Sequence, residues 1–296
     1  AFAGLTRLVP VIHHKEARVA EDNKTPVILW FRRALRLDDN HALHAAVETG
    51  RPVICLYIRE PQHPDIGPLG GASAWWLLPP PLGLRQCLKT QGNDLCLRTG
   101  PAEEVLQDIA RTSGADIVFV NRAYERNSMD RDIALALKDA GIAIRAFHGQ
   151  LLHDPKTIRT GSGNAFKVYT PFWNAMQKLG EPGEPTDPPE TIAAPETHPR
   201  SESLDSWNLL PTKPNWAAGF SDFWTPGEAG AREKLEDLID ADLHDYKQGR
   251  DFPGTDAPSK PPPHPALGAI PPARIWPSPT GPAPGRSPSV SARDAR

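Results

Sequence analysis

Five short apolar runs alternate with helical patterns along the first half of this chain. The runs are rich in Val, Ile and Leu and cover residues 27–31, 53–58, 94–97, 117–121 and 142–147. The helical patterns between them cover residues 40–48, 72–88, 102–112 and 129–140. Such runs are typical of strands buried on both faces of a parallel sheet, connected by helices. The sequence therefore predicts an α/β fold with a doubly wound, five-stranded parallel sheet.

The first apolar run ends in a turn that is rich in arginine. It continues into Asp38, Asp39 and Asn40, whose side-chain oxygens can accept hydrogen bonds from the free N–H groups at the start of the next helix. No glycine-rich phosphate loop follows the strand, so an ordinary dinucleotide-binding fingerprint is absent.

The composition of the chain restricts which partners it can bind and in which cellular compartment we expect it. The net charge is -3, so DNA binding would have to come from a local basic patch and not from a global field. Of the three cysteines, Cys55 and Cys96 lie inside strand-like runs, which favours buried, reduced thiols and a reducing compartment. We see neither a signal peptide nor a membrane-spanning stretch, and we expect a cytoplasmic monomer with no membrane partner.

Three segments resemble motifs of the DNA photolyase/cryptochrome family. Residues 30–40 read WFRRALRLDDN against the family pattern W-F-R-x-D-L-R-x-x-D-N, with Ala34 in place of Asp. Residues 159–173 read RTGSGNAFKVYTPFW against R-T-G-x-G-x-x-(F/Y)-K-V-(F/Y)-T-P-F-W. Residues 246–253 read YKQGRDFP against Y-x-x-x-R-(D/N)-x-P, which in the family opens the flavin-binding helical domain.

This resemblance implies a division of the chain into an antenna domain and the start of an incomplete helical domain. The expected parts are an N-terminal extension (1–24), a Rossmann-like α/β antenna domain (25–150), an interdomain linker (151–214), the beginning of the helical FAD-binding domain (215–276) and a disordered tail (277–296). In the helical part, Thr225, Pro226 and Glu228 predict a helix start with a capping box.

Prolines interrupt the family pattern at two places. Pro79, Pro80 and Pro81 follow a helical Trp-Trp-Leu run, so either the helix restarts after a kink near Leu82 or this copy is impaired there. From residue 258 to 276 the chain reads PSKPPPHPALGAIPPARIW, where the family has T-S-R-L-S-P-H-L-x-F-G-E-I-S-P-R-x-x-W. We interpret the chain as C-terminally truncated or degraded relative to the family.

The resemblance implies three residues that contact flavin or DNA. Tyr246 matches an aromatic residue that contacts the flavin phosphates, and Ser259 matches one position of a phosphate-binding loop. Arg250 matches an arginine that is directed toward the DNA backbone, where a guanidinium can bind phosphate. From the residues alone, Tyr246 can equally be a core aromatic and Arg250 a surface arginine.

An antenna site is implied after the fourth run, because ligands of doubly wound sheets bind at the carboxyl ends of strands. Asn127 matches the Asn of a folate-binding Asn-Glu pair, but Ser128 replaces the Glu. The antenna pigment could be methenyltetrahydrofolate, a deazaflavin or a flavin, or the pocket could be empty. Asn127 could also simply cap the following helix. His41 and His44 lack a third ligand in the sequence, so we expect no metal site.

The function implied by the resemblance is that of a deoxyribodipyrimidine photolyase, a carbon–carbon lyase. In that family FAD drives the light-dependent splitting of cyclobutane pyrimidine dimers in UV-damaged DNA. The alternative is a non-catalytic, pigment-binding or cryptochrome-like α/β domain. Because three prolines, at positions 258, 261 and 262, remove N–H donors from the phosphate-binding loop, we expect weak or absent flavin binding by this chain. The sequence names no catalytic residue.

Overall fold

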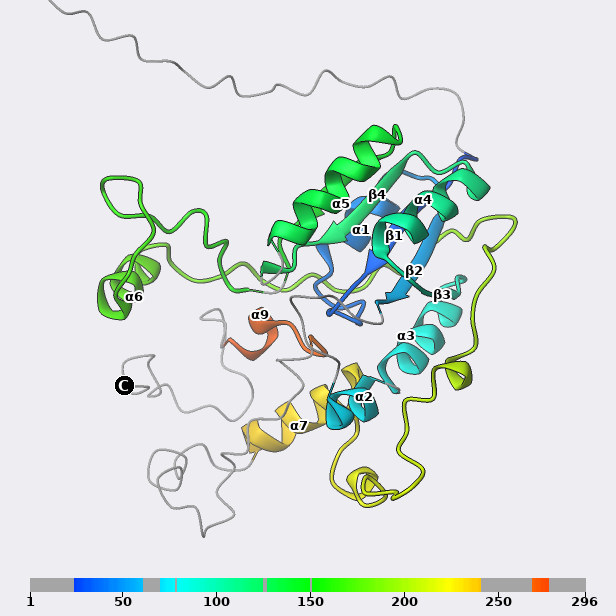
Figure 1. Cartoon of the computed structure of the whole chain (residues 1–296). Helices are drawn as coiled ribbons and strands as arrows, with labels where there is room; N and C mark the ends of the chain where they lie inside the picture. The colour runs from blue at the N-terminus through cyan, green and yellow to red at the C-terminus, as the bar shows by residue number, and fades with distance from the viewer. Residues whose placement is uncertain are drawn as a thin grey trace, which may run out of the picture.

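A computed structural model describes residues 24–60, 70–77, 79–124, 127–149, 151–240 and 268–276, except for the side chains of 127–130 and 238–240. Its centre is one sheet of five parallel strands in the order β3-β2-β1-β4-β5 (Figure 1). The strands are β1 (Val27–Phe31), β2 (Val53–Arg59), β3 (Leu95–Thr99), β4 (Ile117–Asn121) and β5 (Ala143–Phe147). The predicted sheet is therefore confirmed, and the order of its strands reverses between β1 and β4.

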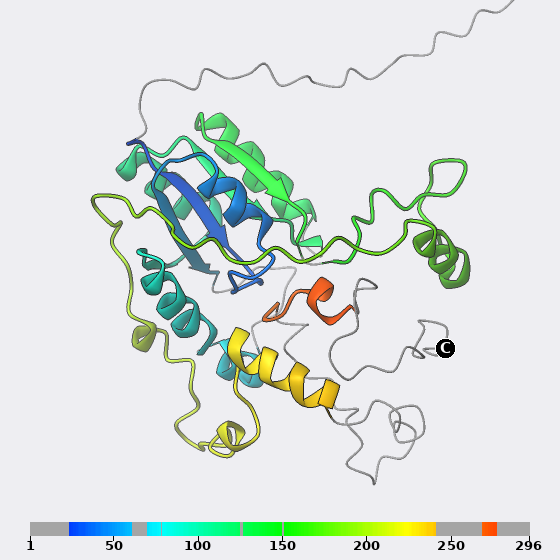
Figure 2. The same cartoon turned by 180° about the vertical axis from the view of Figure 1, so that it is seen from behind.

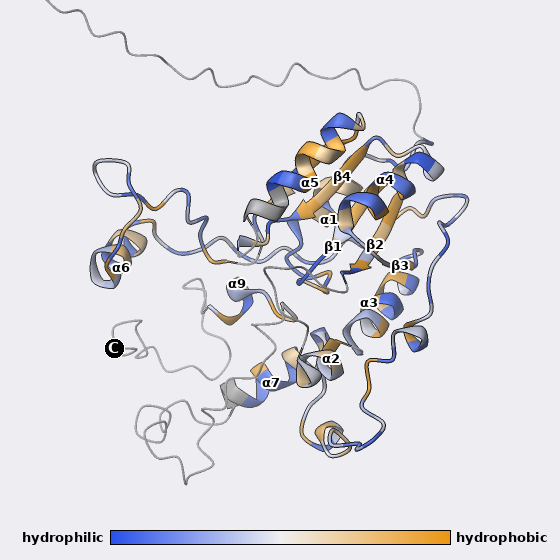
Figure 3. Cartoon of the chain, viewed as in Figure 1, coloured by the Kyte–Doolittle hydropathy of each residue, from blue (hydrophilic) through white to orange (hydrophobic). Residues whose placement is uncertain are grey.

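Helices cover both faces of the sheet, which makes the fold doubly wound. Residues of α1 (His41–Val47) and α3 (Pro79–Thr90) pack with Leu29 and Phe31 on one face. Residues of α4 (Ala102–Ser113) and α5 (Asn127–Asp139) pack with Ile28 and Trp30 on the other. Side chains of a strand point alternately to opposite faces, so apolar strands such as β2 and β4, orange in Figure 3, supply both cores. The expectation of burial is wrong for the edge strand β5, in which no residue is buried.

The proline triplet marks the start of a helix. Helix α2 (Gly71–Leu77) ends before it, and α3 begins at Pro79. Proline is tolerated in the first turn of a helix, because the N–H groups there have no intrahelical acceptor. Helix α3 starts at Pro79, directly after Leu78, which lies outside the described residues, and it runs through Leu82, where we expected the restart.

The segment between the sheet and the last helices is irregular but packed. Ile192, Leu204 and Trp207 are buried in the core under α1 and α3. The Val53 N–H donates to the Ala193 carbonyl at 2.8 Å, and the Glu202 N–H donates to the Leu97 carbonyl at 2.8 Å. This segment also holds a helix that the sequence analysis missed, α6 (Tyr169–Gln177), and a short 3-10 helix, η2 (Leu204–Trp207).

The remaining helices lie beyond the carboxyl ends of the strands in both views (Figures 1 and 2). They are η3 (Phe220–Asp222), α7 (Glu228–Asp240) and α9 (Pro272–Ile275). Trp75 and Trp76 of α2 pack edge-on against Phe220 and Trp224, respectively, which ties this region to the sheet domain. Within the described ranges, no helix is long and apolar enough to span a bilayer.

Candidate functional site

The carboxyl edge of the sheet between β1 and β4 is where a doubly wound fold offers a ligand crevice. The turn after β1, residues 32–40, lies at this edge and is called the polar turn below. It carries the first family-like motif, and its contacts show which side chains of that motif cap a helix and which are buried.

Asn40 closes the polar turn and caps α1. Its Oδ1 accepts hydrogen bonds from the Leu43 N–H at 3.0 Å and from Nδ2 of Asn121 at 2.8 Å. Oδ1 of Asn121, at the end of β4, in turn accepts from the Ala42 N–H at 3.2 Å. A capping side chain satisfies a backbone donor that has no partner within its helix. The predicted cap is therefore confirmed, and the two asparagines join β1 to β4 at the point where the strand order reverses.

Arg36, in the middle of the polar turn, is buried, with only 1% of its surface exposed. Its guanidinium donates to three backbone carbonyls, of Asp38 at 2.9 Å, Gly268 at 2.8 Å and Gly149 at 2.5 Å. Burial lowers the pKa of Arg36, while the nearby carboxylates of Asp39 and Asp38 act in the opposite direction. A buried charge is tolerated when hydrogen bonds replace its hydration, so these carbonyls stabilise Arg36 inside the fold.

Asp38 is equally buried and binds two arginines from the C-terminal helices. Its Oδ1 lies 2.6 Å from Nη2 of Arg274, and its Oδ2 lies 3.3 Å from Nη2 of Arg232. The hydrogen bonds that Arg274 donates to the Asp38 carboxylate raise the pKa of Arg274. Nearby, Oε2 of Glu228 accepts from the Leu37 N–H at 3.2 Å, and Oε1 of Glu228 pairs with Arg232 at 2.9 Å. The expected helix start at Thr225 and Pro226 is wrong, because α7 begins at Glu228, whose carboxylate binds the polar turn and Arg232.

A second polar group lies at the ends of β4 and β5. Oη of Tyr124 is 2.6 Å from Nδ1 of His148, and the rings of His148 and His41 stack with centroids 6.5 Å apart. Burial lowers the pKa of His148 and raises that of Tyr124, so both side chains are neutral near pH 7. Nearby, Arg122 pairs with Asp154 at 3.1 Å. The sequence analysis missed this group, because only the spatial arrangement of three separate segments brings it together.

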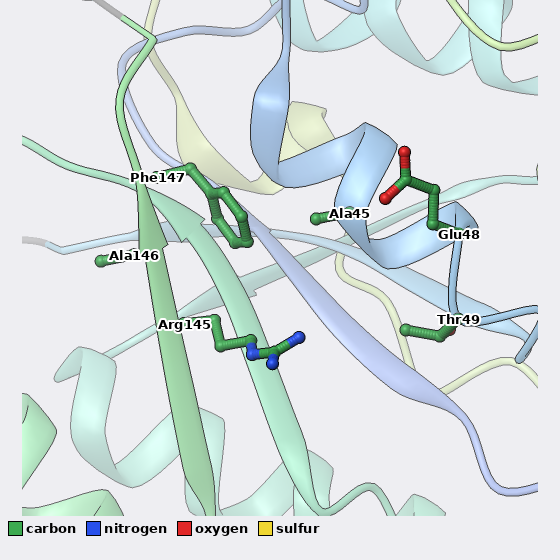
Figure 4. A pocket seen from close by; sticks show the side chains of 6 residues that line it. All are labelled: Ala45, Glu48, Thr49, Arg145, Ala146 and Phe147. Carbon is green, nitrogen blue, oxygen red and sulfur yellow. The ribbon is translucent and has the colours of Figure 1, made fainter. Parts of the chain in front are cut away.

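An open hollow of about 630 Å³ lies between α1 and β5 (Figure 4). Its lining residues are Ala45, Glu48, Thr49, Arg145, Ala146 and Phe147. None of the residues singled out in the sequence lines it. Among the described residues, no group of three or more His, Cys, Asp or Glu side chains is arranged to hold a metal ion.

The sequence-predicted site residues fall mostly outside the described part of the chain. Tyr246, Arg250 and Ser259 lie in the range 241–267, and the tail 277–296 is likewise outside the described residues. Asn127 is the first residue of α5, but its side chain is not among those described. The flavin, DNA and antenna roles of these four residues stay predictions.

Comparison with known proteins gives one consistent result. The family model for DNA photolyase matches residues 27–193. The deoxyribodipyrimidine photo-lyase of Agrobacterium fabrum is 51% identical over 253 residues, which cover 85% of this chain and 52% of the relative. The corresponding protein of Synechococcus is 32% identical over 237 residues, covering 77% of this chain and 48% of that protein.

Plant cryptochromes and solved structures extend the comparison. Cryptochrome-1 of Arabidopsis thaliana is 29% identical over 235 residues, covering 75% of this chain and 33% of its own length. The crystal structure of a bacterial class III photolyase from Agrobacterium tumefaciens superposes with a TM-score of 0.80 at 48% identity, covering 88% of this chain and 54% of that one. The chain thus spans about half the length of the photolyases it matches. The family model and the relatives confirm the resemblance seen in the sequence, and the chain belongs to the DNA photolyase family.

Proposed function

We propose that this chain forms the N-terminal part of a light-dependent DNA repair lyase that splits cyclobutane pyrimidine dimers in UV-damaged DNA. The observation that carries the proposal is the 51% identity over 253 residues to a relative named deoxyribodipyrimidine photo-lyase. An alignment of 253 residues is much longer than the sheet domain, so the similarity does not stop at the sheet.

FAD is the cofactor that this function needs. When bound, it would supply the light-driven electron transfer that opens the dimer. On this chain Tyr246 and Ser259 would contact its phosphates, and Arg250 would bind a phosphate of the damaged DNA. Prolines at 258, 261 and 262 lack N–H donors that phosphate oxygens would otherwise use. We therefore expect the isolated chain to retain FAD weakly.

An antenna pigment, methenyltetrahydrofolate or a deazaflavin, is proposed for the carboxyl edge of the sheet. The described residues offer polar atoms of Tyr124 and His148 there, together with the ring of His41 that stacks on His148. Planar pigments suit such a surface, since aromatic side chains pack on them and a few polar atoms orient them. Asn127 follows β4 at the same edge and remains the proposed folate contact.

The proposal is tested with the chain itself and with a matched chimera. The chimera joins residues 25–240 of this chain to the remaining part of the Agrobacterium fabrum relative. We expect the isolated chain to retain little FAD and to repair no dimer-containing oligonucleotide. We expect the chimera to retain FAD and to repair under blue light but not in the dark. A folded, flavin-loaded chimera that repairs nothing would contradict the lyase function.

A cryptochrome-like function without catalysis is the second candidate, and the match to Cryptochrome-1 favours it. A folded chimera that binds pigment and shows a light-induced absorbance change, but leaves dimers intact, would support it. For either function we propose a cytoplasmic monomer. The cysteines Cys55, Cys87 and Cys96 are free, as in a reducing compartment, and sedimentation of the purified chain would test its oligomeric state.

A further inference from the structure

The carboxylate of Asp38 connects three parts of the chain that are far apart in the sequence. It belongs to the polar turn, and both of its arginine partners come from the C-terminal region. Arg274 binds it through two nitrogens, Nη2 at 2.6 Å and Nε at 3.2 Å. Arg232 of α7 approaches its other face at 3.3 Å. Two N–H groups of one guanidinium that bind the same carboxylate fix the orientation of the two side chains as well as the distance between them.

Further contacts hold the same two segments to the polar turn. The Gly268 carbonyl accepts from the buried Arg36, and the Leu37 N–H donates to Glu228 of α7. Gly268 comes so close that a Cβ placed on it would lie 2.7 Å from the Arg33 carbonyl oxygen. Helix α7 and the segment 268–276 thus meet the polar turn together, although 27 residues separate them (241–267).

The motifs that identify the family do not specify this pair. Asp38 and Arg274 both stand at variable positions, marked x, in the patterns quoted above. One Asp and one Arg of those patterns are replaced in this chain, by Ala34 and Ala273. The family motifs therefore do not predict the Asp38–Arg274 pair, which is seen only in the structure of this chain.

We propose that Asp38 is a positioning residue that holds α7 and the segment 268–276 on the carboxyl edge of the sheet. It thereby fixes the two ends of the stretch whose sequence carries Tyr246, Arg250 and Ser259. Without this carboxylate, the guanidinium groups of Arg36, Arg232 and Arg274 face one another with less compensating negative charge, and like charges at close range repel. The anchoring stands on the contacts alone, whereas its effect on flavin rests on the proposed function.

Hydrogen exchange of the full chain tests the anchoring. In Asp38→Asn, which keeps the shape and removes the charge, we expect amides of 228–240 and 268–276 to exchange about tenfold faster, with the strands unchanged. Arg274→Gln should release only 268–276, and Arg232→Gln only α7. Asp38→Glu should restore part of the protection, because the charge is kept. If Asp38→Asn disturbs the whole sheet, the two arginine variants still decide the matter.

The matched control is Asp94→Asn. It breaks another carboxylate–arginine pair, with Arg85 at 2.5 Å and 2.8 Å, that has no part in this junction. We expect it to leave exchange in 228–240 and 268–276 at the wild-type rate. Equal exchange in wild type and Asp38→Asn, or the same increase in Asp94→Asn, would overturn the anchoring role.

Flavin affinity separates this inference from the proposed function. We expect Asp38→Asn to weaken FAD retention by about tenfold and Arg274→Gln by less. The double variant should be no weaker than Asp38→Asn alone, because Asp38→Asn already removes the contact with Arg274. Asp38→Glu should retain FAD better than Asp38→Asn, and Asp94→Asn should match wild type. If exchange changes as expected while FAD retention is the same in wild type and in both variants, the anchoring stands and only its effect on flavin fails.

Discussion

In the polar turn, Arg36 and Asp38 are each 1% exposed, whereas on helix α6 the aromatic Tyr169 is 71% exposed. Hydropathy alone would predict an exposed arginine and aspartate and a buried tyrosine. The polar turn is buried because partners reach it from residues 81 to 236 positions away in the sequence. Each of its buried charges finds hydrogen bonds that replace water.

Helix α6 stands apart from the sheet in both views (Figures 1 and 2). No residue of this helix, in the structure as described, is buried. Its rings pair within the same short stretch, Tyr169 with Trp173 at 6.2 Å and Phe166 with Phe172 at 6.4 Å. The difference teaches that a side chain is buried when the tertiary fold brings a surface against it, whatever its own polarity.

The largest expected effect is that of Arg36→Met, which tests whether the polar turn is held by its buried charge. The variant leaves three carbonyls without their donor, and we expect it to lower the free energy of unfolding by about 3–5 kcal/mol. Urea unfolding measures this. The control, Arg145→Met, alters an exposed arginine on β5 and should change stability by less than about 0.5 kcal/mol. A small effect at Arg36 would show that packing, and not its hydrogen bonds, buries the turn.

Gly268→Ala tests how closely the distant segment must approach the turn. Gly268 has a φ of 69°, and an added Cβ would meet Arg33 and Ala34. We expect the docking of 268–276 to weaken by about 2–3 kcal/mol, from backbone strain plus overlap. Limited proteolysis and hydrogen exchange of this segment measure the loss.

The control for Gly268 is Gly141→Ala. Gly141 has a similar φ of 76° but nothing within 4 Å of an added Cβ, so only the backbone cost of about 1 kcal/mol remains. Equal losses of stability at the two glycines would mean that the close approach of Gly268 to the polar turn adds nothing to the cost of the substitution.

The pH dependence of stability tests the role of His148 in the polar group at the ends of β4 and β5. Burial lowers its pKa from the ordinary value of 6.5, so the folded state favours the neutral ring, beside Tyr124, His41, Arg122 and Asp154. Its contribution to stability is present above pH 6.5 and is lost as the pH falls through the lowered pKa. We expect His148→Phe to flatten the decline of stability between pH 7 and 5, measured by urea unfolding. A matched substitution at the exposed His198, His198→Phe, should leave the decline unchanged, and an equal effect there would contradict the assignment.

The smallest expected effect is that of Tyr169→Ala on α6. Because nothing covers this side chain in the described structure, we expect the free energy of unfolding to change by less than about 0.5 kcal/mol. The reference is Phe119→Ala in the sheet core, where a fully buried ring is lost and the cost should be about 3–5 kcal/mol. Thermal and urea unfolding compare the two. A loss above about 1.5 kcal/mol at Tyr169 would mean that α6 is covered in solution, and the contrast with the polar turn would fail.

The strands and the four covering helices could be predicted because their signals are local. Prolines explain why the start of one helix was expected too late and why another helix was missed. The triplet at Pro79 suggested a broken helix, and Pro171 lies in a stretch that the sequence analysis left as linker, yet α3 and α6 each carry these prolines in the first turn. A proline disturbs a helix interior but not its start, and propensity alone does not say where a helix begins.

The candidate site was less predictable than the fold. The polar turn was recognised from its motif, and Asn40 was among the expected caps. The partners Gly268, Arg232 and Arg274 carry no signal in the sequence that points to the turn, since an arginine pairs with any carboxylate that the chain path brings near. The same holds for Glu228, whose carboxylate binds a donor from a distant segment.

By itself, the sequence of this protein determined the parallel sheet, its buried strands and its membership of the photolyase family, because apolar periodicity and motif spacing act over a few neighbouring residues. Only the tertiary structure decided that the polar turn is buried and joined to Arg232, Gly268 and Arg274, and that α6 is left exposed. The physical reason is that burial and ion pairing depend on which segments meet in space, and that meeting is set by the path of the whole chain.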